Sequence, residues 1–207
     1  MKSRIAVVLI FGLMVAPMAI GGESPATTQA AREALAASDD FKNGLGQWTT
    51  ELESGGTVVA RDGVLDIDTP AGCTVWFKQK FSGPIKIEYT ATAISAGGKN
   101  DRVSDLNCFW MANDTRSPDD IFGTKRSGKF ADYNQLLTYY VGLGGNTNTT
   151  TRFRRYIGDK EIRPLKPEHD LKGEENLLVA NQPQKITLIA DGSRIEFYRD
   201  DKRLFEL

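Results

Sequence analysis

The chain has 207 residues, of which 40% are hydrophobic, 26% charged and 9% aromatic. This composition is that of an ordinary globular protein and excludes a disordered, collagen-like or coiled-coil chain. The length suits one domain with one sizeable core. The formal net charge of −1 gives no bulk electrostatic reason to bind nucleic acid.

The first residues have the pattern of a secretory signal peptide. Lys2 and Arg4 form a basic start, and the apolar run over residues 5–18 is too short for a comfortable membrane span. Residues 19–21 place small side chains where a signal peptidase reads them. We therefore predict a signal peptide over 1–21, a secreted or periplasmic protein, and no membrane attachment after cleavage. The alternative is an uncleaved N-terminal anchor.

Residues 22–39, rich in Ala, Ser, Thr and Gln, are predicted to be a linker, and residues 40–207 the folded domain. Beyond Asp40 the hydrophobic pattern has mostly a period of two, which predicts strands. The predicted strands cover residues 57–60, 64–68, 74–81, 85–91, 106–111, 136–141, 151–157, 185–190, 194–198 and 203–205. Asp62-Gly63 and Asp191-Gly192 are typical hairpin turns between such runs.

This many short strands predicts an all-β sandwich of two antiparallel sheets, of jelly-roll type. Cys73 and Cys108 lie in strand-like runs, so a cross-strand disulfide and two buried free thiols are both open, with the thiols slightly favoured. Two cysteines and one histidine argue against a structural zinc site. We expect no cofactor and no metal.

The strand that begins near residue 105 carries unusual polar residues. Alternation places Asp105, Asn107 and Phe109 on one face and Leu106 on the other. Asp and Asn are depleted in strands, so these two either line a groove for a polar ligand, together with Arg102 before them, or face solvent on an edge strand.

A long insertion over residues 113–132 follows, and a loop of this length is usually functional or disordered. Tyrosines flanking a groove suit sugar rings, because they combine an apolar face with a hydroxyl. Tyr139 and Tyr140 are adjacent and must point to opposite faces of their strand, so one of them belongs to the core.

The densest group of polar residues is the stretch from Asn146 to Tyr156. Arg152, Arg154 and Tyr156 project from one face of the predicted strand. Because the guanidinium fork binds carboxylates bidentately, the pattern favours an acidic ligand such as a uronate-containing glycan. The alternative is a solvated face paired with carboxylates of a neighbouring strand.

His169, the only histidine, lies in a proline-rich loop. Since histidine titrates near neutral pH, it is a candidate general base if the loop borders the groove; otherwise it is merely exposed. Neither a Gly-x-Ser-x-Gly elbow nor the paired carboxylates of an ordinary glycosidase are visible as a motif.

Three segments, residues 101–112, 139–146 and 150–156, resemble the signature of an uncharacterised bacterial domain family. That family belongs with the concanavalin A-like jelly rolls and is distantly similar to YesU-type proteins found with pectin (rhamnogalacturonan) utilisation genes. The resemblance extends from Asp40 to the C-terminus. It implies a two-sheet sandwich whose concave sheet carries a glycan groove, although a shared fold does not give a shared reaction.

The leading hypothesis is a carbohydrate-active enzyme that acts on an acidic polysaccharide, either as a polysaccharide lyase by β-elimination, which is the favoured chemistry, or as a glycoside hydrolase. A non-catalytic glycan-binding module and a structural protein are the alternatives. Arg152 and Arg154 would hold the carboxylate with help from Asn146, and Tyr140 or His169 would be the base. The remaining candidate groove residues are Arg102, Asp105, Asn107 and Tyr156.

The chain ends at Leu207 within a strand-like run. Related jelly rolls usually continue to a further strand that returns into the sandwich. We therefore expect this sequence to be a fragment that lacks its last strand.

Overall fold

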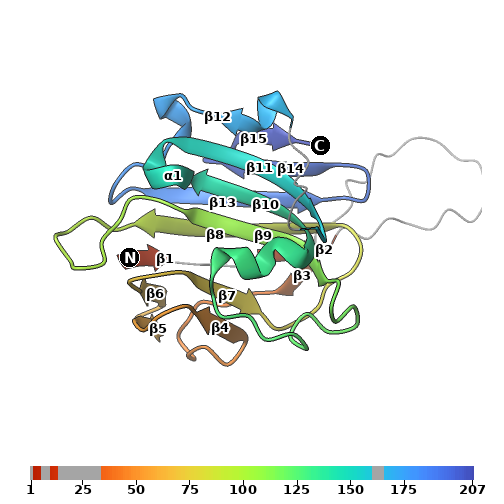
Figure 1. Cartoon of the computed structure of the whole chain (residues 1–207), viewed down its shortest axis with the longest axis horizontal. Helices are drawn as coiled ribbons and strands as arrows, with labels where there is room; N and C mark the ends of the chain where they lie inside the picture. The colour runs from red at the N-terminus through yellow and green to blue at the C-terminus, as the bar shows by residue number, and fades with distance from the viewer. Residues whose placement is uncertain (1, 6–9, 14–33, 160–165) are drawn as a thin grey trace, which may run out of the picture.

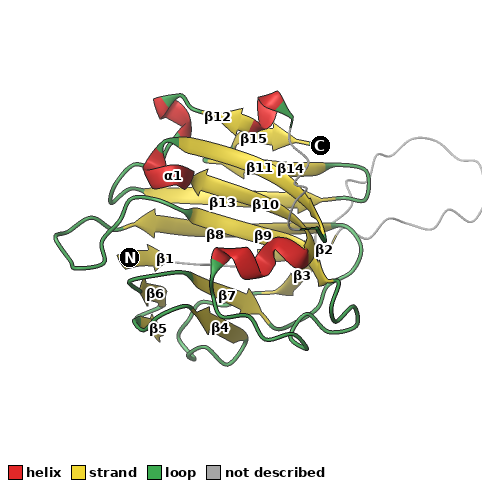
Figure 2. Cartoon of the chain, in the orientation of Figure 1, coloured by secondary structure: helices red, strands yellow, loops and turns green. Residues whose placement is uncertain are grey.

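The computed structural model describes residues 2–5, 10–13, 34–159 and 166–207. These residues form a β-sandwich in which a large antiparallel sheet packs against a smaller one (Figures 1 and 2). The predicted all-β fold of jelly-roll type is confirmed. Among the described residues, no helix is long and apolar enough to cross a membrane.

The larger sheet has the strand order β15-β14-β13-β8-β1-β6-β5, and β2 pairs with β8 and with β3. Its strands are β1 (Lys2–Ile5), β2 (Ile10–Leu13), β3 (Ala34–Ala37), β5 (Thr57–Arg61), β6 (Val64–Asp68), β8 (Ile85–Ala93), β13 (Pro183–Ala190), β14 (Ile195–Arg199) and β15 (Lys202–Glu206).

The smaller sheet has the order β12-β11-β10-β9, and a separate ribbon pairs β4 with β7. Their bounds are β4 (Trp48–Leu52), β7 (Cys73–Phe77), β9 (Leu106–Asp114), β10 (Leu136–Gly144), β11 (Thr150–Ile157) and β12 (Asp170–Leu171). Four short helical turns complete the fold: η1 (Phe130–Gln135), α1 (Gly145–Asn148), η2 (Pro167–His169) and η3 (Glu174–Asn176).

Local sequence explains the hairpins. Arg61 pairs with Val64, and the two residues between them, Asp62 and Gly63, have φ of 50° and 75°. Two positive φ angles define the type I′ turn, whose twist matches that of the strands it joins. The Asp191 carboxylate accepts hydrogen bonds in the β13–β14 turn from the Arg194 side chain and from two backbone N–H groups, and these lower its pKa to about 2.

The core lies between the two sheets. Leu106, Trp110 and Phe153 reach it from the smaller sheet, and Ile186 and Phe197 reach it from the larger one. The alternation expected on β9 is therefore confirmed, since Leu106 and Trp110 are buried in the core while Phe109 belongs to a second cluster. Cys73 and Cys108 are free thiols packed against the core, and burial raises the pKa of each to about 12.

The N-terminal part differs from expectation at one point. Residues 34–37, assigned above to the linker, form β3 and pair with β2. The rest of the predicted linker, up to residue 33, lies outside the described residues. Strands β1 and β2 fall within the predicted signal peptide, which stays a prediction, and a chain cleaved after residue 21 would lose both.

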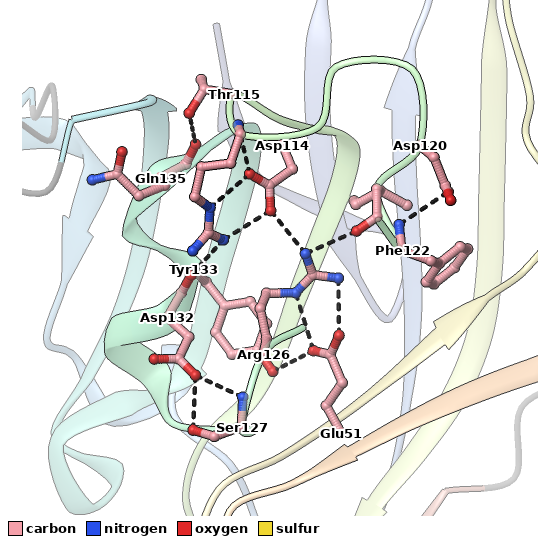
Figure 3. Close-up of polar contacts among 12 residues, drawn as sticks. Glu51, Asp114, Thr115, Asp120, Phe122, Arg126, Ser127, Asp132, Tyr133 and Gln135 are labelled. Atoms are coloured by element: carbon pink, nitrogen blue, oxygen red, sulfur yellow. Dashed lines mark hydrogen bonds and ion pairs between the residues drawn. The ribbon is translucent and has the colours of Figure 1, made fainter. Parts of the chain in front are cut away.

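The segment from residue 115 to 135 joins β9 to β10 and is held by a buried ionic cluster (Figure 3). Arg126 binds Glu51 of β4 through Nη2 and Oε1 at 2.9 Å, and Asp114 of β9 through Nη1 and Oδ2 at 2.9 Å. Tyr133 also donates to Glu51, at 2.7 Å. The segment thereby ties the β4–β7 ribbon to the smaller sheet.

Candidate functional site

Strand register brings the predicted polar residues together on the outer face of the smaller sheet. Gly142 of β10 pairs with Asn107 of β9 on one side and with Arg152 of β11 on the other. Tyr140 pairs in the same way with Phe109 and Arg154. Paired residues share a face, so two adjacent rows of side chains cross three strands.

These residues line part of a cavity of about 1100 Å³ that also reaches core-facing residues such as Leu106, Trp110 and Leu188. Its part on the outer face of the smaller sheet is here called the groove. It extends from this face of β9, β10 and β11 to the β4–β7 ribbon, and the segment over residues 115–135 also contributes to its wall. Eight of the nine predicted site residues border it: Arg102, Asp105, Asn107, Tyr140, Asn146, Arg152, Arg154 and Tyr156.

Gly142 makes room for the Tyr140 hydroxyl. A Cβ atom at Gly142 would lie 2.5 Å from that oxygen, closer than any contact two such atoms tolerate. The Tyr140 ring therefore lies along the sheet with its hydroxyl above Gly142, in the row that holds Asn107 and Arg152. The Oδ1 atom of Asn107 is buried and has no hydrogen-bond partner among the described residues.

Arg152 faces the groove with 37% of its side chain exposed. When the amide oxygen of Asn146 is turned toward it, that oxygen accepts from Nη1 at 3.2 Å and from Nη2 at 2.6 Å. Its Nε lies 3.5 Å from Oδ1 of Asp170, a distance at which the two charges attract without a good hydrogen bond. Asn146 sits in α1, where its φ is 52°, a backbone conformation that asparagine tolerates better than most residues.

Arg154 is more enclosed, with 11% of its side chain exposed. Nη2 binds Oδ1 of Asp170 at 2.9 Å, while Nη1 donates to the backbone carbonyls of Phe153 at 2.8 Å and His169 at 3.4 Å. Protein groups thus use both Nη atoms, and Arg152 is the arginine that presents charge to the groove. One carboxylate, Asp170, is shared by the two arginines.

A second ion pair lies at the start of β9. Arg102 binds the Asp105 carboxylate, which also accepts from Ser104 Oγ. Because these two charges compensate each other, they add polarity to the groove and little net charge. Across the whole groove the basic lining residues outnumber the acidic ones, Glu53, Asp101, Asp105 and Asp119; the basic ones are Lys78, Lys80, Lys99, Arg102, Arg152 and Arg154.

Aromatic rings of the second row, together with Phe130 beside them, form an aromatic wall of the groove. Phe109 lies with its centroid 5.0 Å from Tyr140 and 6.0 Å from Tyr156. Phe130, on η1, packs edge-on against Tyr140 at 5.5 Å and is 41% exposed. Tyr139 packs against the core instead, so the two adjacent tyrosines point to opposite faces as expected.

The protonation of Tyr140 bears on its chemistry. Burial raises the pKa of its phenol, as do the neighbouring Tyr156 and Asp105, while the charges of Arg154 and Arg152 act in the opposite direction. The net shift is upward. The resting side chain is therefore a neutral phenol, suited to donating a hydrogen bond or a proton and poorly suited to accepting one.

The structure does not bring His169 into the groove. Its side chain is buried between Phe153 and Phe205, with ring centroids 4.9 Å and 6.0 Å away, and it is absent from the groove lining. The expectation that its loop places it beside the groove as a base is corrected, because η2 turns the ring into the space between the two sheets.

Sequence reasoning missed three contributors. Asp170 lies next to His169, but only the pairing of β12 with β11 places it opposite Arg152. Phe130 belongs to the insertion, and no local pattern indicates that η1 packs over the sheet. Gly142 has no side chain that would mark it as a site residue, although its position two residues after Tyr140 indicates that the two share a face.

Among the residues that the structure describes, no group of three or more His, Cys, Asp or Glu side chains is placed to hold a metal ion. The donors that line the groove, which are guanidinium groups, amides and phenols, suit an anionic or hydroxyl-rich ligand.

Fold and site together define a β-sandwich protein with a polar, arginine-bearing groove on its smaller sheet. The chain belongs to the DUF6250 family, a domain of unknown function, whose sequence model matches residues 67–207. No curated protein and no solved structure matches the chain. The matched region contains every predicted site residue.

Proposed function

We propose that the protein is a secreted or periplasmic glycan-binding protein whose groove takes an acidic, uronate-containing oligosaccharide. The observation that carries the proposal is Arg152, which is 37% exposed in the groove. Among the residues that the structure describes, it has one carboxylate partner, Asp170, which it shares with Arg154. Two guanidinium groups and one carboxylate leave an excess positive charge. A carboxylate on a ligand would compensate it through charge-assisted hydrogen bonds.

The aromatic wall supports a sugar ligand over other anions. Phe109 and Phe130 offer apolar surfaces, and the Tyr140 hydroxyl lies beside them. Sugars combine apolar C–H faces with hydroxyl edges, so a groove with both kinds of surface suits them. The resemblance to concanavalin A-like jelly rolls and YesU-type proteins adds support, as fold-level analogy.

A second candidate is β-elimination in the same groove, favoured by the position of the Tyr140 hydroxyl in the row of Asn107 and Arg152. In that reaction Arg152 would neutralise the uronate carboxylate, and a base would remove the proton on C5. The C4–C5 double bond would form as the C4–O bond breaks, and the leaving oxygen would take up a proton from an acid or from water. With His169 outside the groove, Tyr140 is the base candidate that remains. Its raised pKa makes binding without turnover the better-supported function.

Calorimetric titration of the purified protein tests binding. The panel pairs oligogalacturonates and oligoglucuronates with their methyl esters, which keep the sugar and remove the charge. We expect binding to the acids, weakening as salt rises, and at least tenfold weaker binding to the esters. Equal affinity for acids and esters, or no binding to any member, would contradict the proposal.

Turnover is tested separately on the same acids. Elimination creates a conjugated double bond in the product, so its absorbance reports the reaction directly. We expect binding without a rise in absorbance. A rise that is lost in Tyr140→Phe would establish the second candidate in place of the first.

A further inference from the structure

We propose that His169 is a positioning residue, which holds the groove arginines in place by connecting Asp170 and Arg154 to the C-terminal strand β15. Its effect on ligands rests on the proposed function, but the placement of the arginines does not. The ring belongs to the only histidine of the chain, is buried, and lies outside the groove.

The His169 ring is fixed from three sides. Phe153 of β11 meets it edge-on at 4.9 Å with an interplanar angle of 72°, and Phe205 of β15 at 6.0 Å with 83°. Nε2 lies 3.3 Å from the backbone carbonyl of Glu206. Since a carbonyl only accepts, Nε2 carries the proton in this contact. The imidazole therefore joins the edge of the smaller sheet to the edge of the larger one.

The backbone of the same residue faces the groove arginines. The carbonyl of His169 accepts from Arg154 Nη1 at 3.4 Å, and the next residue, Asp170, binds Arg154 Nη2 at 2.9 Å. Asp170 also pairs with Arg152 in the β11–β12 register. A displacement of residues 169 and 170 would therefore move the one carboxylate that both arginines share.

These contacts hold β12 in place, because the strand is too short to be fixed by its own backbone hydrogen bonds. The strand has two residues, Asp170 and Leu171, and two paired positions with β11. So short an edge strand has few ladder hydrogen bonds of its own. The buried imidazole on one side and the two arginines on the other fix its position, and the fit of Arg152 to a ligand depends on that position.

The experiment measures the accessibility of the arginines in the ligand-free protein. Phenylglyoxal modifies exposed guanidinium groups, and peptide mass spectrometry separates Arg152 from Arg154. In the wild type we expect Arg152 to react and Arg154 to be protected. In His169→Leu, which keeps an apolar side chain but loses the bond to Glu206, we expect Arg154 to react roughly two- to tenfold faster, the change that losing one hydrogen bond implies.

A second substitution at residue 169 separates the effect of the hydrogen bond from the effect of side-chain volume. Glutamine places an amide N–H near the position of Nε2, so His169→Gln is expected to keep Arg154 protected. If His169→Leu does not fold, His169→Asn replaces it, because its amide is too short to reach the Glu206 carbonyl. Asp170→Asn serves as the positive control, in which both arginines should become more reactive.

Ile85→Val, a core substitution on β8, controls for general loosening when compared at an equal loss of thermal stability. The proposal is overturned if Arg154 stays protected in His169→Leu, or if Ile85→Val exposes Arg154 equally. The reagent needs no glycan. If the protein binds no glycan, the proposed function is contradicted, but the reactivities of the arginines still test the role of His169.

Discussion

Arg126 and Arg152 both pair with carboxylates carried by strands, but their surroundings differ in charge balance and exposure. Arg126 is fully buried between Glu51 and Asp114, and Arg116 supplies a second cation to Asp114. Two cations thus meet two anions. Within the described part of the chain, Arg152 and Arg154 share a single carboxylate, Asp170, and Arg152 remains 37% exposed. The contrast separates an arginine that holds the fold from one that is available to a ligand.

Hydrogen bonding shows the same contrast. Glu51 accepts from Trp76, Tyr133 and Arg126, and the one Arg126 nitrogen that makes no hydrogen bond to a described residue, Nη2, lies 2.9 Å from Glu51 Oε1 as an ion pair. In the groove, Asn107 Oδ1 and Arg152 Nε are buried without a hydrogen-bond partner among the described residues. Polar atoms left in this state are uncommon in folded proteins, and a ligand or a water molecule in the groove would complete them.

The largest expected effect is on the buried cluster. Arg126→Ala leaves two buried carboxylates without their shared cation, and removing one partner of such a cluster costs about 3–5 kcal/mol. Urea denaturation should show this loss of unfolding free energy. Lys125→Ala, at the exposed neighbouring position, should change stability by less than about 0.5 kcal/mol. A similarly small loss for Arg126→Ala would mean that the cluster does not hold the segment.

Arg152→Ala should have the opposite effect to Arg126→Ala, with a large loss of ligand affinity and a small loss of stability. Its exposed ion pair contributes at most about 1 kcal/mol to stability, whereas losing a charged hydrogen bond to the ligand costs about 1.5–3 kcal/mol of affinity. Titration with an acidic oligosaccharide should therefore show at least tenfold weaker binding with little change in the denaturation midpoint. Arg155→Ala, on the same strand but outside the groove lining, is the matched control and should bind as the wild type does.

Acid should weaken the buried cluster. Burial alone would raise the pKa of Asp114, but hydrogen bonds from Arg116 and the charges of Arg116 and Arg126 outweigh it, and the pKa is lowered from 3.8. The unfolded chain then binds more protons, so this contribution is complete above the unfolded pKa and is lost as pH falls through the folded one. Urea denaturation at about unit steps between pH 5 and pH 2 should show that the free energy of unfolding falls with pH. The fall should be smaller in Asp114→Asn, which lacks the titrating carboxylate.

The last prediction concerns the reactivity of the two thiols and involves no change in stability or ligand affinity. Burial raises the pKa of Cys73 and Cys108 to about 12 from 9.0, so few thiolates exist near neutral pH. Because the thiolate is the reactive form, labelling of the native protein with a disulfide reagent at pH 8 should be far slower than labelling in urea. Rapid labelling of the native state would show that the sandwich opens readily around β7 and β9.

Much of the fold could be predicted from the sequence because strand signals are local. Alternation over residues 64–68 and 85–91 located β6 and β8, and Asp62-Gly63 predicted the hairpin before β6. The same period of two placed Arg152 and Arg154 on one face. These inferences needed only the geometry of a pleated strand.

The missing parts depend on contacts between distant residues. Glu51 and Arg126 are 75 residues apart, so nothing local marks them as a pair. His169 lies in a polar, proline-rich stretch that predicts exposure, yet η2 turns it into the core. The role of Asp170 as the shared carboxylate follows from the pairing of a two-residue strand, which is too short to leave a periodic signal.

A crystal structure of the protein with an acidic oligosaccharide in the groove is the most direct test of the central claim. The account predicts a carboxylate within hydrogen-bonding distance of the Arg152 guanidinium, a sugar face against Phe109 or Phe130, and an unchanged Arg126 cluster. A ligand bound elsewhere, or one whose carboxylate points to solvent while Arg152 keeps only Asn146 and Asp170 as partners, would contradict it.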